Sequence, residues 1–105
     1  MPDVISEDRA LRIFGLLGLA ARAGQVTSGE SACVDLIRSG KAIVCLVDEG
    51  SSDNAKKRLF DSCAHYGVAI ALVPGERLGA SIGKPSRKAV CLSKGSFAIQ
   101  VCSLL

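Results

Sequence analysis

The sequence predicts an α/β layered sandwich in one domain. Three runs of the chain, 42–47, 68–73 and 89–92, are continuously apolar, as strands are when both faces of their sheet are covered. Segments with helical spacing of apolar residues separate these runs, and this alternation is typical of layered α/β folds. A length of 105 residues suits one domain, and a hydrophobic share of 49% is enough for a buried core. The predicted domain therefore spans residues 1–105.

The first helix is predicted over residues 6–22. Ser6 can begin it, with Asp8 and Arg9 in the first turn, and Gly24 ends it. The residues predicted to face the core are Ala10, Ile13, Phe14, Leu17 and Ala21, with Leu11, Leu16 and Leu19 widening the apolar stripe. A helix with so wide a stripe is expected to be largely buried, and a short strand could follow at 25–27.

The second helix is predicted near residues 29–39, and it leads through Ser39 and Gly40 into the apolar strand at 42–47. Its core face is predicted to hold Ala32, Cys33, Leu36 and Ile37. The third helix is predicted to begin after a cap at one of residues 51–53 and to end at Tyr66, because Gly67 follows. The residues predicted to point inward from it are Ala55, Leu59, Cys63 and Tyr66, while Lys56, Lys57 and Arg58 point outward.

The second half of the chain repeats the alternation. Pro74 and Gly75 stop the second buried strand, since proline and glycine are the strongest local breakers of regular structure. The remaining elements are predicted in the order strand 68–73, short helix 76–82, loop 84–88, strand 89–92 and helix 95–104.

Charge is distributed unevenly along the chain. The formal net charge is only +3, but no acidic residue follows Glu76, and five basic ones do: Arg77, Lys84, Arg87, Lys88 and Lys94. The last 29 residues therefore carry +5 and the first 76 carry −2. This asymmetry indicates an anionic partner, of which nucleic acid is the commonest, although solvated surface lysines are the simpler alternative.

The cysteines and the N-terminal composition indicate a cytoplasmic protein. Five cysteines occur, an odd number without a C-x-x-C pair, and Cys33, Cys45, Cys63 and Cys91 lie within apolar patterns, as buried free thiols do. The single histidine has no cysteine at zinc-finger spacing, so no metal site is predicted. Acidic residues near the N-terminus do not suit a signal peptide, and the apolar run 13–21 is too short to span a bilayer.

Neither of the two motifs that could indicate catalysis is complete. Gly79-x-x-x-Gly83-Lys84 resembles a P-loop, but its spacing is one residue short and Pro85 stands where a Ser or Thr should bind Mg²⁺. His65 with a cysteine could form a dyad, yet the chain offers no orienting group or oxyanion donors for it. We therefore expect no catalytic residue, no cofactor and no enzymatic activity.

Two segments remain as candidates for binding an anion. The loop 84–88 holds three cations without an acidic neighbour, and such side chains release counterions when they bind phosphates. An ordinary exposed loop is the alternative. The turn at Thr27, Ser28 and Gly29 precedes a helix whose first amides lack intrahelical partners, and such a turn can receive a phosphate or a flipped base. Aromatic residues are scattered, so recognition of a folded RNA by shape is favoured over base stacking.

Several segments together resemble a known family. They are LGLAARAG (17–24), SGE (28–30) with IRSGKA (37–42), VCLVDE (44–49), NAKKRLFDSCAHYGV (54–68) and ERLGASIGK (76–84). In this order and spacing they are similar to the ribosomal protein family of L-seven-Ae and L-thirty-e, most closely to its bacterial YlxQ-like branch. The resemblance implies a three-layer α-β-α sandwich around a four-stranded mixed sheet. It also implies binding of structured RNA, a kink-turn or ribosomal RNA, in a ribonucleoprotein setting with ribosomal proteins as possible neighbours. A monomer is expected.

The resemblance also places residues at the RNA. By matching position, the start of the second helix, the acidic residue that ends the next strand, and the loop before the last strand would contact it. Together with the cations above, the predicted RNA-binding residues are Gly29, Glu30, Ser31, Lys41, Glu49, Lys84, Pro85, Arg87 and Lys88.

The chain departs from the kink-turn binders at three positions of the second helix. Where those proteins carry Asn, Glu and Lys, this chain has Ser31, Ala32 and Asp35. Asn and Glu read base edges and Lys contacts phosphate, so we expect kink-turn discrimination to weaken while general RNA binding persists. A module that kept the fold and docks a protein, on this helix or on the tail 101–105, is the rival interpretation. A redox sensor is a third, and it requires an exposed thiol of lowered pKa.

Overall fold

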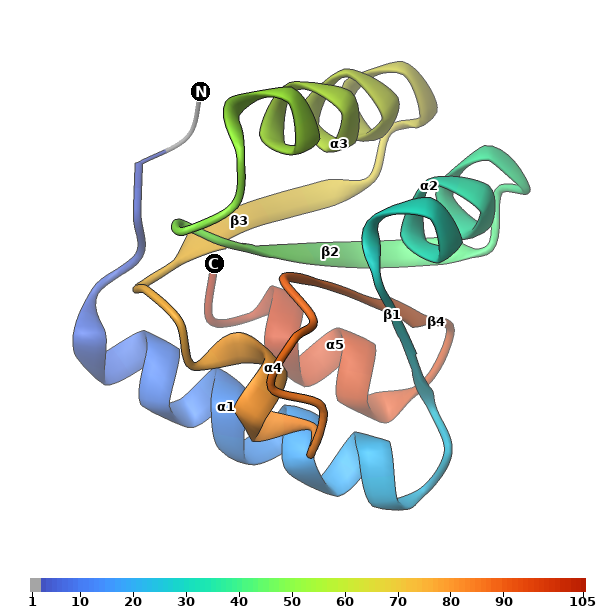
Figure 1. Ribbon diagram of the computed structural model, residues 1–105. Coiled ribbons are helices and arrows are strands. Elements are labelled where there is room, and N and C mark those ends of the chain that lie inside the picture. Colours follow the sequence, from blue (N-terminus) through green and yellow to red (C-terminus); the bar gives the residue numbers. More distant parts are fainter. Residues whose placement is uncertain (1–2) are drawn as a thin grey trace.

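A computed structural model describes residues 3–105 and contains five helices and one four-stranded sheet (Figure 1). The first two residues of the predicted domain lie outside the described part. In chain order the elements are α1 (Glu7–Arg22), β1 (Val26–Ser28), α2 (Glu30–Arg38), β2 (Ala42–Asp48), α3 (Asp53–Tyr66), β3 (Ala69–Val73), α4 (Leu78–Ser81), β4 (Ala89–Ser93) and α5 (Ser96–Cys102). In these residues no helix has both the length and the apolar character needed to cross a membrane.

The sheet is mixed, with the strand order β1-β4-β2-β3. β2 and β3 run parallel, whereas β4 is antiparallel to both of its neighbours. The last strand in sequence is thus inserted between the first two. The chain also adds a single parallel bridge beyond β3, where the Ile5 amide donates to the Leu72 carbonyl at 3.0 Å.

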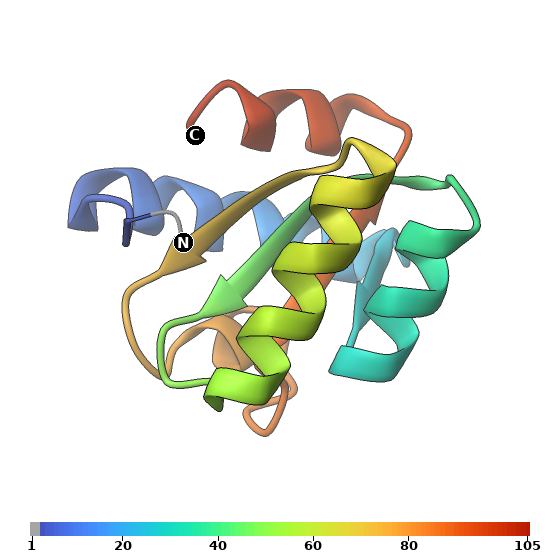
Figure 2. The same cartoon turned by 90° about the horizontal axis from the view of Figure 1, so that it is seen from above.

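Helices cover both faces of the sheet, as Figures 1 and 2 show. α2 and α3 lie on one face, and α1 and α5 lie on the other, with α4 beside them. One apolar cluster, built around Ile13, Leu46 and Leu92, fills the space under α1 and α5. A second, built around Ile37 and Leu59, fills the space under α2 and α3. The three-layer sandwich and the four-stranded mixed sheet are therefore confirmed.

The predicted ends of the helices agree with the structure to within a few residues. Ser6 and Ser52 cap α1 and α3, each accepting a hydrogen bond from the amide three residues on. Gly67 ends α3 in the left-handed conformation. The short strand lies at 26–28 instead of 25–27, and α5 ends at Cys102. The helix expected at 76–82 is only Leu78–Ser81, because Glu76 has a φ of 67°, which no helix accepts.

The core faces were predicted less well. Leu11 and Leu19 are 55% and 53% exposed, so α1 is not largely buried; the sheet and α5 cover only its inner side. In α2 the buried residue beside Cys33 is Val34, and Ala32 is exposed. Tyr66 is 44% exposed, since it lies in the last turn of α3 where the helix leaves the sheet. A periodic pattern gives the axis of an apolar stripe more reliably than its width.

Candidate nucleic-acid interface

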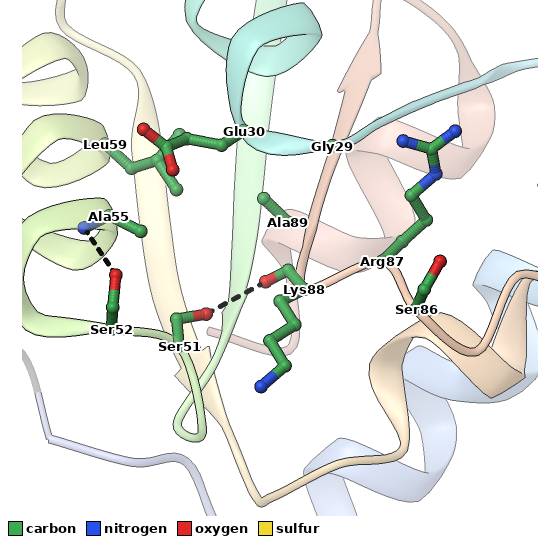
Figure 3. Close-up of a pocket in the computed structure, with 10 residues that line it drawn as sticks. All are labelled: Gly29, Glu30, Ser51, Ser52, Ala55, Leu59, Ser86, Arg87, Lys88 and Ala89. Atoms are coloured by element: carbon green, nitrogen blue, oxygen red, sulfur yellow. Dashed lines mark hydrogen bonds between the residues drawn. The ribbon is translucent and has the colours of Figure 1, made fainter.

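The loop 84–88, which we name the basic loop, lies between the N-termini of α2 and α3 (Figure 3). This position follows from the strand order, because β4 pairs with β1 on one side and with β2 on the other. The Gly29 amide donates to the Ala89 carbonyl at 2.9 Å, and the Asp48 amide donates to the Lys88 carbonyl, also at 2.9 Å. The start of β4 is thereby fixed between the β1–α2 junction and the β2–α3 turn.

These three segments enclose a pocket of about 420 Å³, which we name the central pocket. Its lining residues are Gly29, Glu30, Ser51, Ser52, Ala55, Leu59, Ser86, Arg87, Lys88 and Ala89. The lining combines a small apolar part with hydroxyl groups and two cations. Four of the residues predicted to bind RNA, Gly29, Glu30, Arg87 and Lys88, come together here, although up to 59 positions separate them in sequence.

The N-terminus of α2 forms one wall of the central pocket. Gly29 precedes the helix with φ 96° and ψ 147°, and no side chain within residues 3–105 caps the first turn. The first hydrogen bond of the helical ladder runs from the Cys33 amide to the Gly29 carbonyl at 2.9 Å. The amides of residues 30–32 therefore have no intrahelical acceptor, and they carry the positive end of the helix dipole.

The N-terminus of α3 forms the opposite wall. Ser52 caps this helix, and its Oγ accepts from the Ala55 amide at 3.1 Å. Ser51 is buried, and its Oγ donates to the Lys88 carbonyl at 3.4 Å, which ties the turn to the basic loop. Two helix N-termini thus border one pocket, and each favours an anion.

Arg87 and Lys88 add positive charge to this setting. A Cβ atom placed on Gly29 would lie 3.0 Å from Arg87 Nη1, so the guanidinium lies directly beside the glycine. Lys88 Nζ donates to the Gly50 carbonyl at 3.1 Å, and both cations remain exposed. The carboxylate of Glu30 is paired with Arg58 at 3.0 Å, which offsets the only acidic side chain in the lining.

Gly79 packs directly against the backbone of the basic loop. A Cβ atom at this position would lie 2.4, 2.5 and 2.8 Å from the carbonyl oxygens of Lys84, Arg87 and Pro85. The loop therefore wraps around a residue without a side chain, and the Lys84 amide donates to the Gly79 carbonyl at 2.9 Å. In the sequence this glycine drew attention only through the incomplete P-loop pattern, which gave no sign of its packing role.

Two carboxylates hold the turns behind the central pocket. β2 ends at Asp48, one residue before the predicted acidic contact at Glu49. Asp48 is 1% exposed and accepts from the Gly50 amide at 2.8 Å and from the Glu76 amide at 2.8 and 3.0 Å. Glu49 is exposed, lies outside the pocket lining, and accepts from the Gly75 amide at 2.6 Å. Both side chains thus join the β2–α3 turn to the β3–α4 turn.

The other predicted contacts lie at different distances from the central pocket. Ser31 is exposed in the first turn of α2, and Lys84 and Pro85 are exposed in the basic loop. Lys41 precedes β2, whereas Lys88 lies opposite the last residue of that strand. At about 3.3 Å per residue the two cations are separated by roughly 20 Å, so Lys41 is not part of the pocket.

The positions that depart from the kink-turn binders face solvent. Ser31, Ala32 and Asp35 are all exposed on α2, so the Asp35 carboxylate is not forced into the pocket. The residues at or behind the pocket that sequence reasoning did not name as binding residues are Asp48, Ser51, Ser52, Ala55, Leu59, Gly79, Ser86 and Ala89. The two serines at the start of α3 had a signal only as helix caps, and Ala55 and Leu59 only as core residues.

The cysteines do not provide the exposed reactive thiol that a redox sensor requires. Cys33, Cys45, Cys63 and Cys91 are free and buried in the core under α2 and α3. Cys102 is half-buried, and burial raises the pKa of its thiol, which lowers its reactivity. In the part of the chain that is described, no group of histidine, cysteine and acidic residues is suited to a metal ion.

The chain is similar in sequence to several known proteins. The model of the Ribosomal protein L7Ae/L30e/S12e/Gadd45 family matches residues 12–103. The chain is 41% identical to the RNA-binding protein YlxQ of Bacillus subtilis (strain 168) over 93 residues, which cover 88% of this chain and 93% of that protein. It is 31% identical to the RNA-binding protein YlxQ of Enterococcus faecium over 102 residues, covering 96% and 98% of the two chains.

Solved structures share the same fold. A protein of unknown function from Bacillus halodurans superposes with a TM-score of 0.83 and 30% identity, over 89% of this chain and 95% of that one. The Giardia lamblia 15.5kD RNA binding protein superposes with a TM-score of 0.78 and 16% identity, over 97% and 94% of the chains. At that identity the second likeness concerns the fold alone.

Proposed function

Since this chain belongs to the ribosomal protein L7Ae/L30e/S12e/Gadd45 family, we propose that it binds structured RNA at the central pocket and the basic loop, without catalysing a reaction. Its two bacterial relatives are both named as RNA-binding proteins, which supports this proposal. The observation that carries it is the convergence of two helix N-termini with Arg87 and Lys88 around one pocket.

The chemistry of the central pocket suits a nucleotide. The free amides at the start of α2 and the guanidinium of Arg87, which lies beside Gly29, are both donors suited to a phosphate. A volume of about 420 Å³ also leaves room for an extruded base against the apolar side chains of Ala55 and Leu59. Lys84 and Lys88 extend the positive surface along the loop, where they can follow the RNA backbone.

The RNA itself is proposed to be a kink-turn or a ribosomal segment, in a cytoplasmic, ribosome-associated setting. Serine, alanine and aspartate at positions 31, 32 and 35 remove the side chains that read base edges in kink-turn binders. One lost bidentate pair costs about 1–3 kcal/mol of discrimination. We therefore expect binding in which phosphate contacts contribute most and preference for the kink is modest.

Titration of a labelled kink-turn RNA and a matched unkinked duplex, each at low and moderate salt, tests the proposal. Three phosphate contacts, from Lys84, Arg87 and Lys88, predict that the logarithm of affinity falls with the logarithm of salt with a slope of about −2 to −3. Replacing Arg87 and Lys88 by Glu should abolish binding to both RNAs. Lys94→Glu is the matched control, because Lys94 follows the opposite end of β4.

Three outcomes separate the alternatives. Preference for the kink-turn RNA would support recognition of that motif in spite of the altered α2. Equal, weak affinity for both RNAs would leave backbone attraction alone. Absence of binding at low salt would refute the proposal and favour the protein-interaction module, which could use the exposed face of α2.

A further inference from the structure

The outward face of α1 carries apolar surface that the RNA proposal does not use. Leu11 and Leu19 are more than half exposed, although leucine is among the residues most often buried. On the neighbouring helix α5, Ile99 is 70% exposed. A hollow of about 500 Å³ lies between the two helices, lined by Leu11, Arg12, Gly15, Leu16, Leu19, Gln100, Ser103 and Leu104. The exposed leucines are thus part of one continuous surface and are not scattered singly.

The exposed residues of α1 follow a symmetric pattern along the helix. Gly15 lies at the centre, Leu11 and Leu19 lie four residues to either side, and Asp8 and Arg22 lie seven residues to either side. All five are exposed. Because successive helical residues are about 100° apart, these positions share one face of the helix, within about 40° of Gly15.

This pattern is complementary to itself when the helix direction is reversed. If two copies of α1 cross antiparallel about a two-fold axis at Gly15, Leu11 of each copy meets Leu19 of the other. Asp8 of each copy then meets Arg22 of the other, so opposite charges face each other at both ends. Each contact occurs twice, as a two-fold interface requires.

Gly15 allows such helices to approach closely. A Cβ atom at Gly15 would meet nothing within 4 Å, so no other part of the described chain fills this space. Two helices need axes about 8–10 Å apart for their side chains to interdigitate, and a glycine at the crossing point permits the short end of that range. The hollow beside it can receive a leucine of the other copy, as a knob enters a hole.

We propose that the face of α1 formed by Asp8, Leu11, Gly15, Leu19 and Arg22 is a two-fold interface between two copies of this chain. Such a dimer differs from the monomer expected from the sequence. α1 lies on the face of the sheet opposite α2 and α3 (Figure 2), so the dimer leaves both helices free. Two central pockets would then be carried by one particle, and an RNA with two suitable sites would bind with increased avidity.

Sedimentation velocity of the full chain without RNA, from micromolar to millimolar protein, tests the proposal. Asp8→Arg and Arg22→Asp should each raise the dissociation constant of the dimer by about tenfold or more at low salt, since each places like charges opposite one another twice. The double variant restores opposite charges and should return close to the original dissociation constant. Leu11→Ser with Leu19→Ser should give a monomer, and circular dichroism verifies that each variant is folded.

Tyr66→Ser is the matched control, because Tyr66 is similarly exposed on α3 in the other helical layer. A weaker dimer in each single charge reversal, its recovery in the double variant and an unchanged control would support the interface. A chain that remains monomeric at millimolar concentration would overturn it. A dimer that survives both serine substitutions, or that the control disrupts, would also overturn it, because another surface would then hold the copies together.

Discussion

Replacing Gly79 by Ala tests how the basic loop is held. The added Cβ would lie 2.4 to 2.8 Å from three carbonyl oxygens of the loop, whereas ordinary contacts begin at 3.4 Å. The oxygens would have to retreat by roughly 0.6 to 1 Å, and overpacking of this kind costs about 1–3 kcal/mol. Alanine regains up to about 1 kcal/mol through helix propensity. We expect a net loss of about 1–2 kcal/mol in the free energy of unfolding.

The same substitution at Gly15 is the matched control. Gly15 is also helical, but its added Cβ would meet no atom of the described residues within 4 Å, so the helix propensity should raise the free energy of unfolding by about 0.5–1 kcal/mol. Urea unfolding followed by circular dichroism measures both variants, at dilution so that self-association does not contribute. Equal stability of the two variants would refute the packing argument.

RNA titration shows whether the loop moves. Because the Arg87 carbonyl is among the three displaced oxygens, Gly79→Ala should shift the Arg87 guanidinium away from Gly29 and weaken RNA binding several-fold. Gly15→Ala should leave the affinity for an RNA with a single site unchanged, when the protein is dilute enough that self-association does not contribute. A Gly79→Ala variant that is destabilised but binds RNA at full strength would mean that the position of the loop does not control binding.

Three further predictions concern single interactions. Asp48→Ala should lower the free energy of unfolding by more than about 2 kcal/mol in urea titration, because the amides of Gly50 and Glu76 lose a charged acceptor. Ser52→Ala should cost about 1 kcal/mol, measured in the same way, because the Ala55 amide loses its cap. The hydrogen bond from Arg77 lowers the pKa of Glu7 below its usual value of 4.5, so this pair contributes stability above that pH and loses it as the pH falls through the lowered pKa. In thermal melts, the melting temperature of Glu7→Gln should therefore be slightly below that of the unmodified chain at neutral pH. The two melting temperatures should converge in acid.

The alternation of elements could be predicted from local signals. The signals that set the helices act over only a few residues: apolar periodicity, the cap at Ser52 and the stop at Gly67. They can therefore be recognised in the sequence alone. The same reading gave the basic loop and Gly29 as candidates. The family resemblance supplied the sheet and its mixed direction, which no local pattern contains.

The parts that could not be predicted depend on which strands are neighbours. Lys41 and Lys88 are both basic and both adjoin strands, and only the pairing of β2 with β4 shows that they lie at opposite ends. The role of Gly79 depends on carbonyl oxygens five to eight residues away that fold back over it. Leu11 and Leu19 cannot be told from buried leucines by residue type, and only the packing of α1 shows that they face outward.

The position of β4 also has a consequence for synthesis. Among the described strands β1 pairs only with β4, and β2 reaches β1 only through β4, so residues 26–28 wait for a strand partner until residues 90–92 have been translated. The nascent chain can form helices early, but the sheet closes late, since its central pairings are distant in sequence. The proposed RNA site includes the start of β4, so it is assembled only after residues 89–93 have joined the sheet between β1 and β2.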